Sequence, residues 1–246
     1  MGYHWDWLVF LQTVPSGETT YLAWLLTGAG WTILLSLSGW LLALLVGGAV
    51  GVANTLPWPW LTRMATGYVE LFRNIPLLVQ LFLWYFVLPE VLPTAWGNAI
   101  KQSHPLTQQF LAAWLCLGLF TAARVAEQVR AGIQSLPVGQ YQAAQALGLS
   151  RSQSYRHVLL PVALRLILPT LTSEFINIFK NSAVATTIGL VELSRQAQQL
   201  SDYSAHPYEA FIAVTFLYLI INLVVTTLMI RLERGVALPG QGGKPP

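Results

Sequence analysis

The sequence predicts an all-α membrane protein with about five transmembrane helices, an external N-terminus and a cytoplasmic C-terminus. Three observations lead to this prediction: the scarcity of charge, the long apolar stretches and the distribution of cations. Charged residues make up 9% of the 246 residues and apolar residues 54%, whereas soluble domains average about a quarter charged residues. Aromatic residues form 12% of the chain, which excludes a disordered protein.

Five stretches are long enough to cross a bilayer core, which takes about 20 apolar residues in helical form. Three of them contain no charged residue, and we expect spans over about 21–52, 102–123 and 210–230. Two further stretches carry charges and are also expected to be helical spans, over about 65–88 and 164–190.

Lysine and arginine set the predicted orientation. With the N-terminus outside, eight of these cations fall in cytoplasmic segments, and only Lys101 and Arg195 fall in external ones. This bias follows the positive-inside rule, and an odd number of spans then places the C-terminus in the cytoplasm. The first twenty residues lack Lys and Arg, so no cleavable signal peptide is expected.

We expect one transmembrane domain over residues 1–235, with a cytoplasmic loop over 131–165, and a C-terminal tail over 236–246. A net charge of +3 is too small to indicate a nucleic-acid partner. The four histidines are far apart in the sequence and Cys116 is the only cysteine, so neither a metal site nor a cofactor is expected.

The loop between the third and fourth expected spans predicts two short helices with a bend at Gly148, because glycine adopts the positive φ that ends many helices. Ser150 is placed to cap a second helix beginning near Arg151, and Pro161 is expected to end it. Such a hairpin either lies on the membrane surface as an amphipathic loop or fits a groove on a soluble partner.

The spacing of small and apolar residues in this loop resembles the EAA loop of ABC-importer permeases. The opening glutamate of that motif is Gln142 here, so a charge contact to the ATPase is expected to be weaker or absent, although glutamine still forms hydrogen bonds. The resemblance assigns ATPase coupling to Gln142, Ala143, Ala144, Gly148, Arg151 and Pro161.

Nearly the whole chain resembles the polar amino-acid ABC-transporter permeases of the histidine/glutamine type, most closely the glutamate/aspartate subgroup. The matching stretches include YVELFRNIPL over 68–77, FTAARVAEQVR over 120–130 and KNSAVATTIGL over 180–190. The resemblance implies the type I ABC-importer permease fold in a bacterial inner membrane. It also implies a second, related but distinct permease subunit, two ATPase subunits and an external substrate-binding protein.

The function that the resemblance implies is translocation of acidic amino acids, and another polar amino acid is the alternative substrate. The chain has no G-x-x-x-x-G-K-[ST] sequence, so we expect it not to be an enzyme and ATP to be hydrolysed by a partner. An ion-coupled carrier is disfavoured because five spans do not divide into two repeats.

Charged groups inside the expected spans are candidates for the substrate pathway. Glu70 and Arg73 can pair along one helix face, as a structural pair or as part of a gate, and Pro76 is expected to bend that helix. Arg124 suits a substrate with two carboxylates, because a guanidinium binds a carboxylate bidentately. The alternatives for Arg124 are pairing with Glu127 or reaching the cytoplasm.

The fourth expected span carries a polar stripe. Glu174, Asn177 and Asn181 share one helix face, and we expect that face to point inward. With Lys180 and Ser182 they either line the pathway or form a packing network that joins Glu174 to Lys180.

Two further features are predicted. Residues 192–204 read as a short amphipathic helix and a docking face for the binding protein. Six glycines in the first span allow close helix contact, either in a dimer interface or in packing within the chain. These glycines are Gly28, Gly30, Gly39, Gly47, Gly48 and Gly51.

Overall fold

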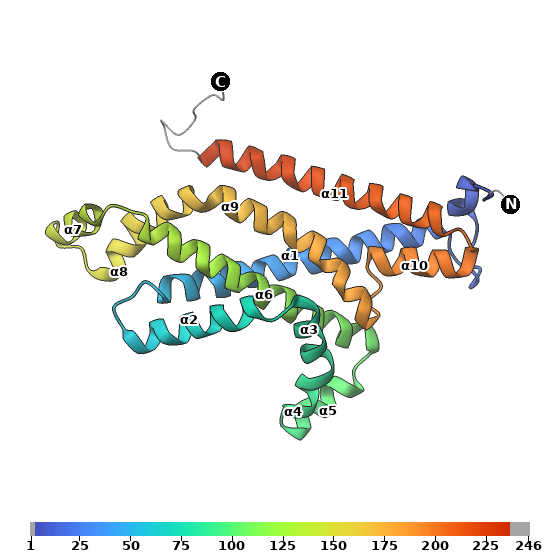
Figure 1. The fold of residues 1–246 in the computed structure, drawn as a ribbon, viewed down its shortest axis with the longest axis horizontal. Coiled ribbons are helices and arrows are strands. Elements are labelled where there is room, and N and C mark those ends of the chain that lie inside the picture. Colours follow the sequence, from blue (N-terminus) through green and yellow to red (C-terminus); the bar gives the residue numbers. More distant parts are fainter. Residues whose placement is uncertain (1–2, 237–246) are drawn as a thin grey trace. The chain divides into compact units, whose positions relative to one another are not determined.

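Helices account for nearly all of the regular structure in the computed structural model, which describes residues 3–236 (Figure 1). Within that range the α-helices are α1 (Tyr21–Ala53), α2 (Pro59–Asn74), α3 (Leu77–Phe82), α4 (Leu88–Val91), α5 (Thr94–Gln102), α6 (Pro105–Gln134), α7 (Val138–Ala146), α8 (Arg151–Ser154), α9 (Leu160–Asn181), α10 (Leu193–Ser204) and α11 (Pro207–Val236). Short 3-10 helices cover Trp7–Leu11 and Ser182–Ile188, and π-helical turns cover Leu83–Val87 and Tyr155–Leu159. The predicted all-α class is confirmed.

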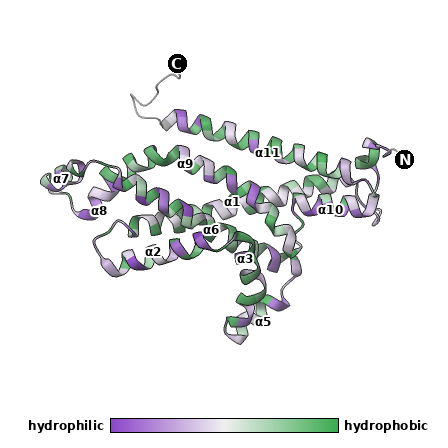
Figure 2. Ribbon diagram, in the orientation of Figure 1, coloured by the Kyte–Doolittle hydropathy of each residue, from purple (hydrophilic) through white to green (hydrophobic). Residues whose placement is uncertain are grey.

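Four helical segments of the described chain are long and apolar enough to cross a membrane: Tyr21–Ala53, Pro105–Gln134, Arg151–Ile188 and Pro207–Gly235. A fifth crossing is formed if α2 and the helical stretch Leu77–Val91, which are bent by 104°, count as one broken span. Figure 2 shows hydrophobic residues along most of α1 and α11, and hydrophilic residues in α10 and in α7. The described chain therefore has five candidate spans only if the broken helix pair is counted as one span.

The expected bend at Pro76 is confirmed, but the stretch predicted over 65–88 is two separate helices with other bounds. The first helix begins earlier, at Pro59, and ends at Asn74. Ile75 is extended, with φ −96° and ψ 129°, because the ring of the following proline disfavours helical backbone in the residue before it. Pro76 therefore breaks the span, and α3 begins anew after it.

The prediction that Pro161 ends a helix is wrong. Proline lacks an N–H, and its ring clashes with the carbonyl four residues earlier in an α-helix. Here a π-helical turn, in which the N–H of Leu160 bonds to the carbonyl of Tyr155, directly precedes Pro161. The wider turn accommodates the ring, and Pro161 lies in the first turn of α9, where its missing N–H is tolerated. Pro89 follows the other π turn in the same way.

The described chain forms two compact units. The first unit comprises residues of Met1–Trp40, Pro76–Gly118 and Asn177–Val224, and the second those of Leu41–Ile75, Leu119–Ile176 and Val225–Pro246. Helices α1, α6, α9 and α11 each contribute a segment to both units. The single domain over 1–235 stays a prediction, and residues 237–246 of the expected tail lie outside the described residues. The ends of the expected loop over 131–165 belong to α6 and α9.

The core of the first unit joins the N-terminal segment and the start of α1 to α10 and α11. Its buried residues are Val9, Val14, Tyr21, Leu25, Leu193, Ala197, Leu200, Ala210 and Val214. The predicted amphipathic helix over 192–204 is confirmed as α10, which buries its apolar face in this core. Its role in docking a binding protein stays a prediction.

Glu192 caps α10 from a buried position. Its carboxylate accepts the backbone N–H groups of Ser194 and Arg195 at 3.0 Å each and the hydroxyl of Tyr218 at 2.7 Å. Burial raises the pKa of the Glu192 carboxyl above its ordinary value, although these hydrogen bonds act in the opposite direction. The cap therefore links α10 to α11 through a carboxyl with an elevated proton affinity.

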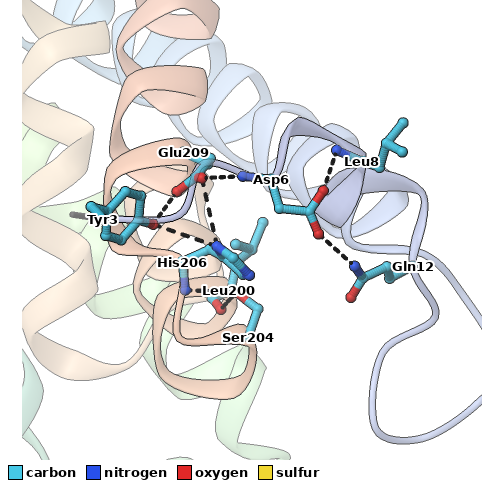
Figure 3. Close-up of polar contacts among 8 residues, drawn as sticks. All are labelled: Tyr3, Asp6, Leu8, Gln12, Leu200, Ser204, His206 and Glu209. Carbon is cyan, nitrogen blue, oxygen red and sulfur yellow. Dashed lines mark hydrogen bonds and ion pairs between the residues drawn. The ribbon is translucent and has the colours of Figure 1, made fainter. Parts of the chain in front are cut away.

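A second buried carboxylate attaches the N-terminal segment to α11, as Figure 3 shows. Glu209, in the first turn of α11, accepts the backbone N–H of Asp6 at 2.7 Å and the hydroxyl of Tyr3. The Tyr3 hydroxyl also lies 3.4 Å from Nδ1 of His206. These contacts hold the chain that precedes the first span in a defined place.

In the second unit, α1 lies close against α6. A Cβ atom added at Gly47 would be 2.5 Å from the carbonyl oxygen of Ala122, and one at Gly51 would be 2.6 Å from Cβ of Val129. Such distances are too short for any side chain, so both positions require glycine. The glycine spacing is that of the small-xxx-small pattern of membrane helices, and here it serves packing within the chain.

Candidate functional site

An ion pair inside the second unit joins two of the predicted pathway residues. Nε of Arg124, on α6, lies 2.7 Å from Oε2 of Glu174, on α9. The side chain of Arg124 is 43% exposed and that of Glu174 is 10% exposed. A charged residue within a span needs a partner, and each of these residues supplies it for the other.

Neighbouring polar groups complete this arrangement. Nε2 of Gln128 donates to the other carboxylate oxygen of Glu174 at 3.4 Å. Glu127 pairs with Arg130, one turn further along α6, so the alternative pairing of Arg124 with Glu127 is wrong. The guanidinium of Arg124 also lies 5.9 Å from the centre of the Phe120 ring, within the range of a cation–π contact.

The pair borders a small open cavity of about 230 Å³. Arg73 from α2 lines it together with Arg124, Glu127, Gln128 and Glu174. The expected pair of Glu70 with Arg73 is wrong, because no ion pair joins them among the described residues and both side chains are exposed. Arg73 is near the end of α2, beside the break at Pro76, and it borders the cavity instead.

The charges of the side chains that line this site balance. The cavity is lined by two guanidinium groups and two carboxylates, and one of these carboxylates, that of Glu127, is paired with Arg130. A guanidinium has five N–H donors, so the single hydrogen bond of Arg124 to Glu174 leaves capacity for a bidentate carboxylate contact.

The rest of the predicted pathway lies in the first unit. Asn177 and Asn181 are half-buried on α9, and Lys180 is exposed in the last turn of that helix. The hydroxyl of Ser182 is buried and donates to the carbonyl of Phe179 at 2.8 Å. The expected Glu174–Lys180 network is replaced by the Arg124–Glu174 pair, and a pathway role for these four residues stays a prediction.

The loop between α6 and α9 forms the predicted hairpin. Helix α7 ends before Gly148, which has φ +79°. Ser150 caps α8 with a complete capping box: its hydroxyl accepts the N–H of Gln153 at 3.3 Å, and the Gln153 side chain accepts the N–H of Ser150 at 2.8 Å. The predicted bend and cap are both confirmed.

The exposed tip of this hairpin carries a leucine among small and polar side chains. Leu147 is 81% exposed, and Gln142, Ala143 and Arg151 are also exposed, whereas Ala144 is buried. An exposed leucine beside small residues and a cation is suited to docking on another protein. The structure therefore presents most of the predicted coupling residues on an accessible surface.

Gln128 is a site residue that we did not predict from the sequence. It is four residues after Arg124, so both lie on the same face of α6. Gln128 was not selected because it carries no charge, although its spacing from Arg124 indicates a shared helix face.

Comparison with known proteins places the chain in a family. The family model described as binding-protein-dependent transport system inner membrane component matches residues 46–238. The glutamate/aspartate import permease protein GltJ of Escherichia coli (strain K12) is 53% identical over 246 residues, covering 99% of this chain and all of GltJ. The nopaline transport system permease protein NocM of Agrobacterium fabrum is 36% identical over 70% of each chain.

The fold is also similar to that of a solved transporter. A crystal structure of an amino acid ABC transporter with histidines superposes with a TM-score of 0.74 and 30% identity, covering 87% of this chain and 95% of the other. The helical arrangement of this chain is therefore that of a known transporter fold. The chain is a member of the family of inner membrane components of binding-protein-dependent transport systems.

Proposed function

We propose that this chain is the membrane-spanning permease subunit of an ATP-driven importer of acidic amino acids, glutamate and aspartate, in a bacterial inner membrane. The observation that carries the proposal is the similarity to GltJ over the full length of both chains. The Arg124 guanidinium, which borders the cavity with donors left over from its bond to Glu174, suits a carboxylate ligand and supports the same substrate class.

In this proposal the cavity binds each charged group of the substrate with a group of opposite sign. Arg124 and Arg73 attract the two carboxylates, and Glu174 attracts the ammonium group. The Arg124–Glu174 pair keeps both charges partnered when substrate is absent, because an isolated charge at membrane depth costs about 2.5–3.5 kcal/mol. Substrate then exchanges one set of ion pairs for another, so binding leaves no charge without a partner.

The hairpin of α7 and α8 is proposed to dock on a separate ATPase subunit, which hydrolyses the ATP. A second permease, two ATPase subunits and an external binding protein complete the proposed complex. Nucleotide drives the permease between its states only to the extent that it binds them with different affinity, so the hairpin must be firmly joined to the spans. The capping box and the unbroken helical path from α8 to α9 provide such a connection.

Reconstitution tests the proposed function. Vesicles that contain the complete complex should take up labelled glutamate only when ATP and the binding protein are both present, and unlabelled aspartate should compete. Uptake by this chain alone, without an ATPase, contradicts the proposal. Equal competition by a neutral or cationic amino acid contradicts the substrate class but leaves the permease function standing.

The role of Arg124 is tested separately with Arg124→Tyr in the same vesicles. We expect the affinity for glutamate to fall by about tenfold or more, because one charge-assisted hydrogen bond contributes about 1.5–3 kcal/mol. Arg63→Tyr is the matched control, since Arg63 is exposed on α2 and does not line the cavity. Unchanged affinity and selectivity in Arg124→Tyr would exclude Arg124 from recognition.

A further inference from the structure

A second, larger cavity lies in the second unit, away from the Arg124 site. It is an open groove of about 870 Å³ between the end of α1, the segment that follows it and the start of the α8–α9 helical path. The residues important for its chemistry are Val52, Leu56, Trp58, Arg151, Arg156 and Leu160. The substrate site does not use this groove, and α8 of the hairpin that is proposed to dock on the ATPase lines one side of it.

Hydrogen bonds fix the shape of the groove. The hydroxyl of Tyr155 donates to the carbonyl oxygen of Thr55 at 3.0 Å and lies 3.2 Å from the Thr55 hydroxyl. This contact ties the segment after α1 to the π turn between α8 and α9. Nε of Arg151 donates to the hydroxyl of Tyr141 at 3.4 Å. The walls of the groove are therefore joined to each other by hydrogen bonds.

The lining of the groove is amphipathic. Val52, Leu56 and Leu160 provide an apolar part, whereas Arg151 and Arg156 are exposed cations. None of the lining residues is acidic, so the two guanidinium groups create an uncompensated positive potential. A ligand that matches this lining has a negatively charged head and an apolar tail.

The groove lies at the level where a membrane surface is expected. It adjoins the C-terminal end of the first span, which the cation distribution places on the cytoplasmic side. Trp58 lines it and is 49% exposed, and Trp60 nearby in the sequence is 63% exposed. Tryptophan is enriched at the headgroup level of bilayers, and basic pockets on the cytoplasmic side suit anionic lipid headgroups.

We propose that this groove binds an anionic phospholipid of the cytoplasmic leaflet, with its phosphate at Arg151 and Arg156 and an acyl chain against Val52, Leu56 and Leu160. The bound lipid contacts both the segment after α1 and the start of the helical path from α8 to α9. The proposal commits to lipid because the charge and the apolar lining occur together in one groove.

Native mass spectrometry of the assembled complex tests the proposal. The complex is titrated with phosphatidylglycerol or with phosphatidylcholine of the same acyl chains, and we expect clear preference for phosphatidylglycerol. Arg156→Gln should weaken phosphatidylglycerol binding about fivefold, the effect of one basic residue near an anionic membrane surface. Arg156→Lys keeps the charge and should retain most of the binding.

Arg63→Gln is the control, because Arg63 is an exposed cation of the same unit that does not line the groove. An equal loss in Arg63→Gln overturns the proposal, since it shows general attraction of charge. Equal binding of both lipids overturns it as well. If water-soluble glycerol phosphate displaces the lipid, the acyl chain has no role in binding and the proposal is overturned. If a bound ATPase excludes the lipid, the groove belongs to the ATPase interface, which overturns the proposal as well.

Discussion

Close contact between α1 and α6 gives a quantitative prediction about Gly51. An added Cβ at this position lies 2.6 Å from Cβ of Val129 and 2.7 Å from the carbonyl oxygen of Ala126. Ordinary contact begins at 3.4 Å, so in Gly51→Ala the helices must separate locally by about 0.8 Å. Overpacking of this kind costs about 1–3 kcal/mol of unfolding free energy.

Gly48→Ala is the matched control. It lies three residues away on the same helix, and an added Cβ there has no atom within 4 Å. Both substitutions gain about 1 kcal/mol of helix propensity, which cancels in the comparison. We therefore expect Gly51→Ala to be less stable than Gly48→Ala by about 1–3 kcal/mol, with a difference in Tm of about 2–4 °C for each kcal/mol.

The assay uses the only cysteine of the chain. Cys116 is fully buried, so a dye that fluoresces on reaction with thiols reports its exposure as the purified protein is heated. Both variants carry the same thiol, and their unfolding curves are directly comparable. Equal Tm values for Gly51→Ala and Gly48→Ala would refute the close contact and the requirement for glycine at position 51.

Two further predictions concern contacts that fix the ends of the spans. The raised pKa of Glu192 means that its carboxyl binds a proton more readily in the folded state than in the unfolded state. The contribution of Glu192 to stability is therefore greatest below the unfolded value of about 4.3 and is lost as pH rises through the folded pKa. Glu192→Gln should remove this part of the pH dependence in thermal unfolding followed by tryptophan fluorescence, and an unchanged pH dependence contradicts the prediction. Tyr155→Phe removes the hydrogen bonds to Thr55 and should lower the free energy of unfolding by about 0.5–1.5 kcal/mol. We expect faster amide hydrogen exchange in residues 54–58. Unchanged exchange in these residues contradicts a link between the segment after α1 and the π turn.

The spans could be predicted from the sequence because their signal is local. Charge-free stretches of sufficient length specify α1, α6 and α11 without knowledge of any contact. The effect of proline on a helix was harder to predict, and it differed between Pro76 and Pro161. Pro76 breaks its helix, whereas Pro161 is accommodated by a π turn, and this choice depends on hydrogen bonds that adjust over several residues and leave no clear pattern in the sequence.

The charged residues of the site could be selected from the sequence, but their partners could not. Arg124 and Glu174 were both candidates because charges inside spans are costly. Their pairing joins residues 50 positions apart, while local spacing suggested Glu127 for one and Lys180 for the other. Pairs within one helix are readable from spacing, as Glu127 with Arg130 shows, but pairs between helices depend on how α6 and α9 pack.

The most direct test of the proposed recognition is a structure of the assembled complex with glutamate bound in the permease. The account predicts a substrate carboxylate within hydrogen-bonding distance of the Arg124 guanidinium and the substrate ammonium beside Glu174. Glutamate bound elsewhere, with the 2.7 Å contact between Arg124 and Glu174 unchanged, would contradict it.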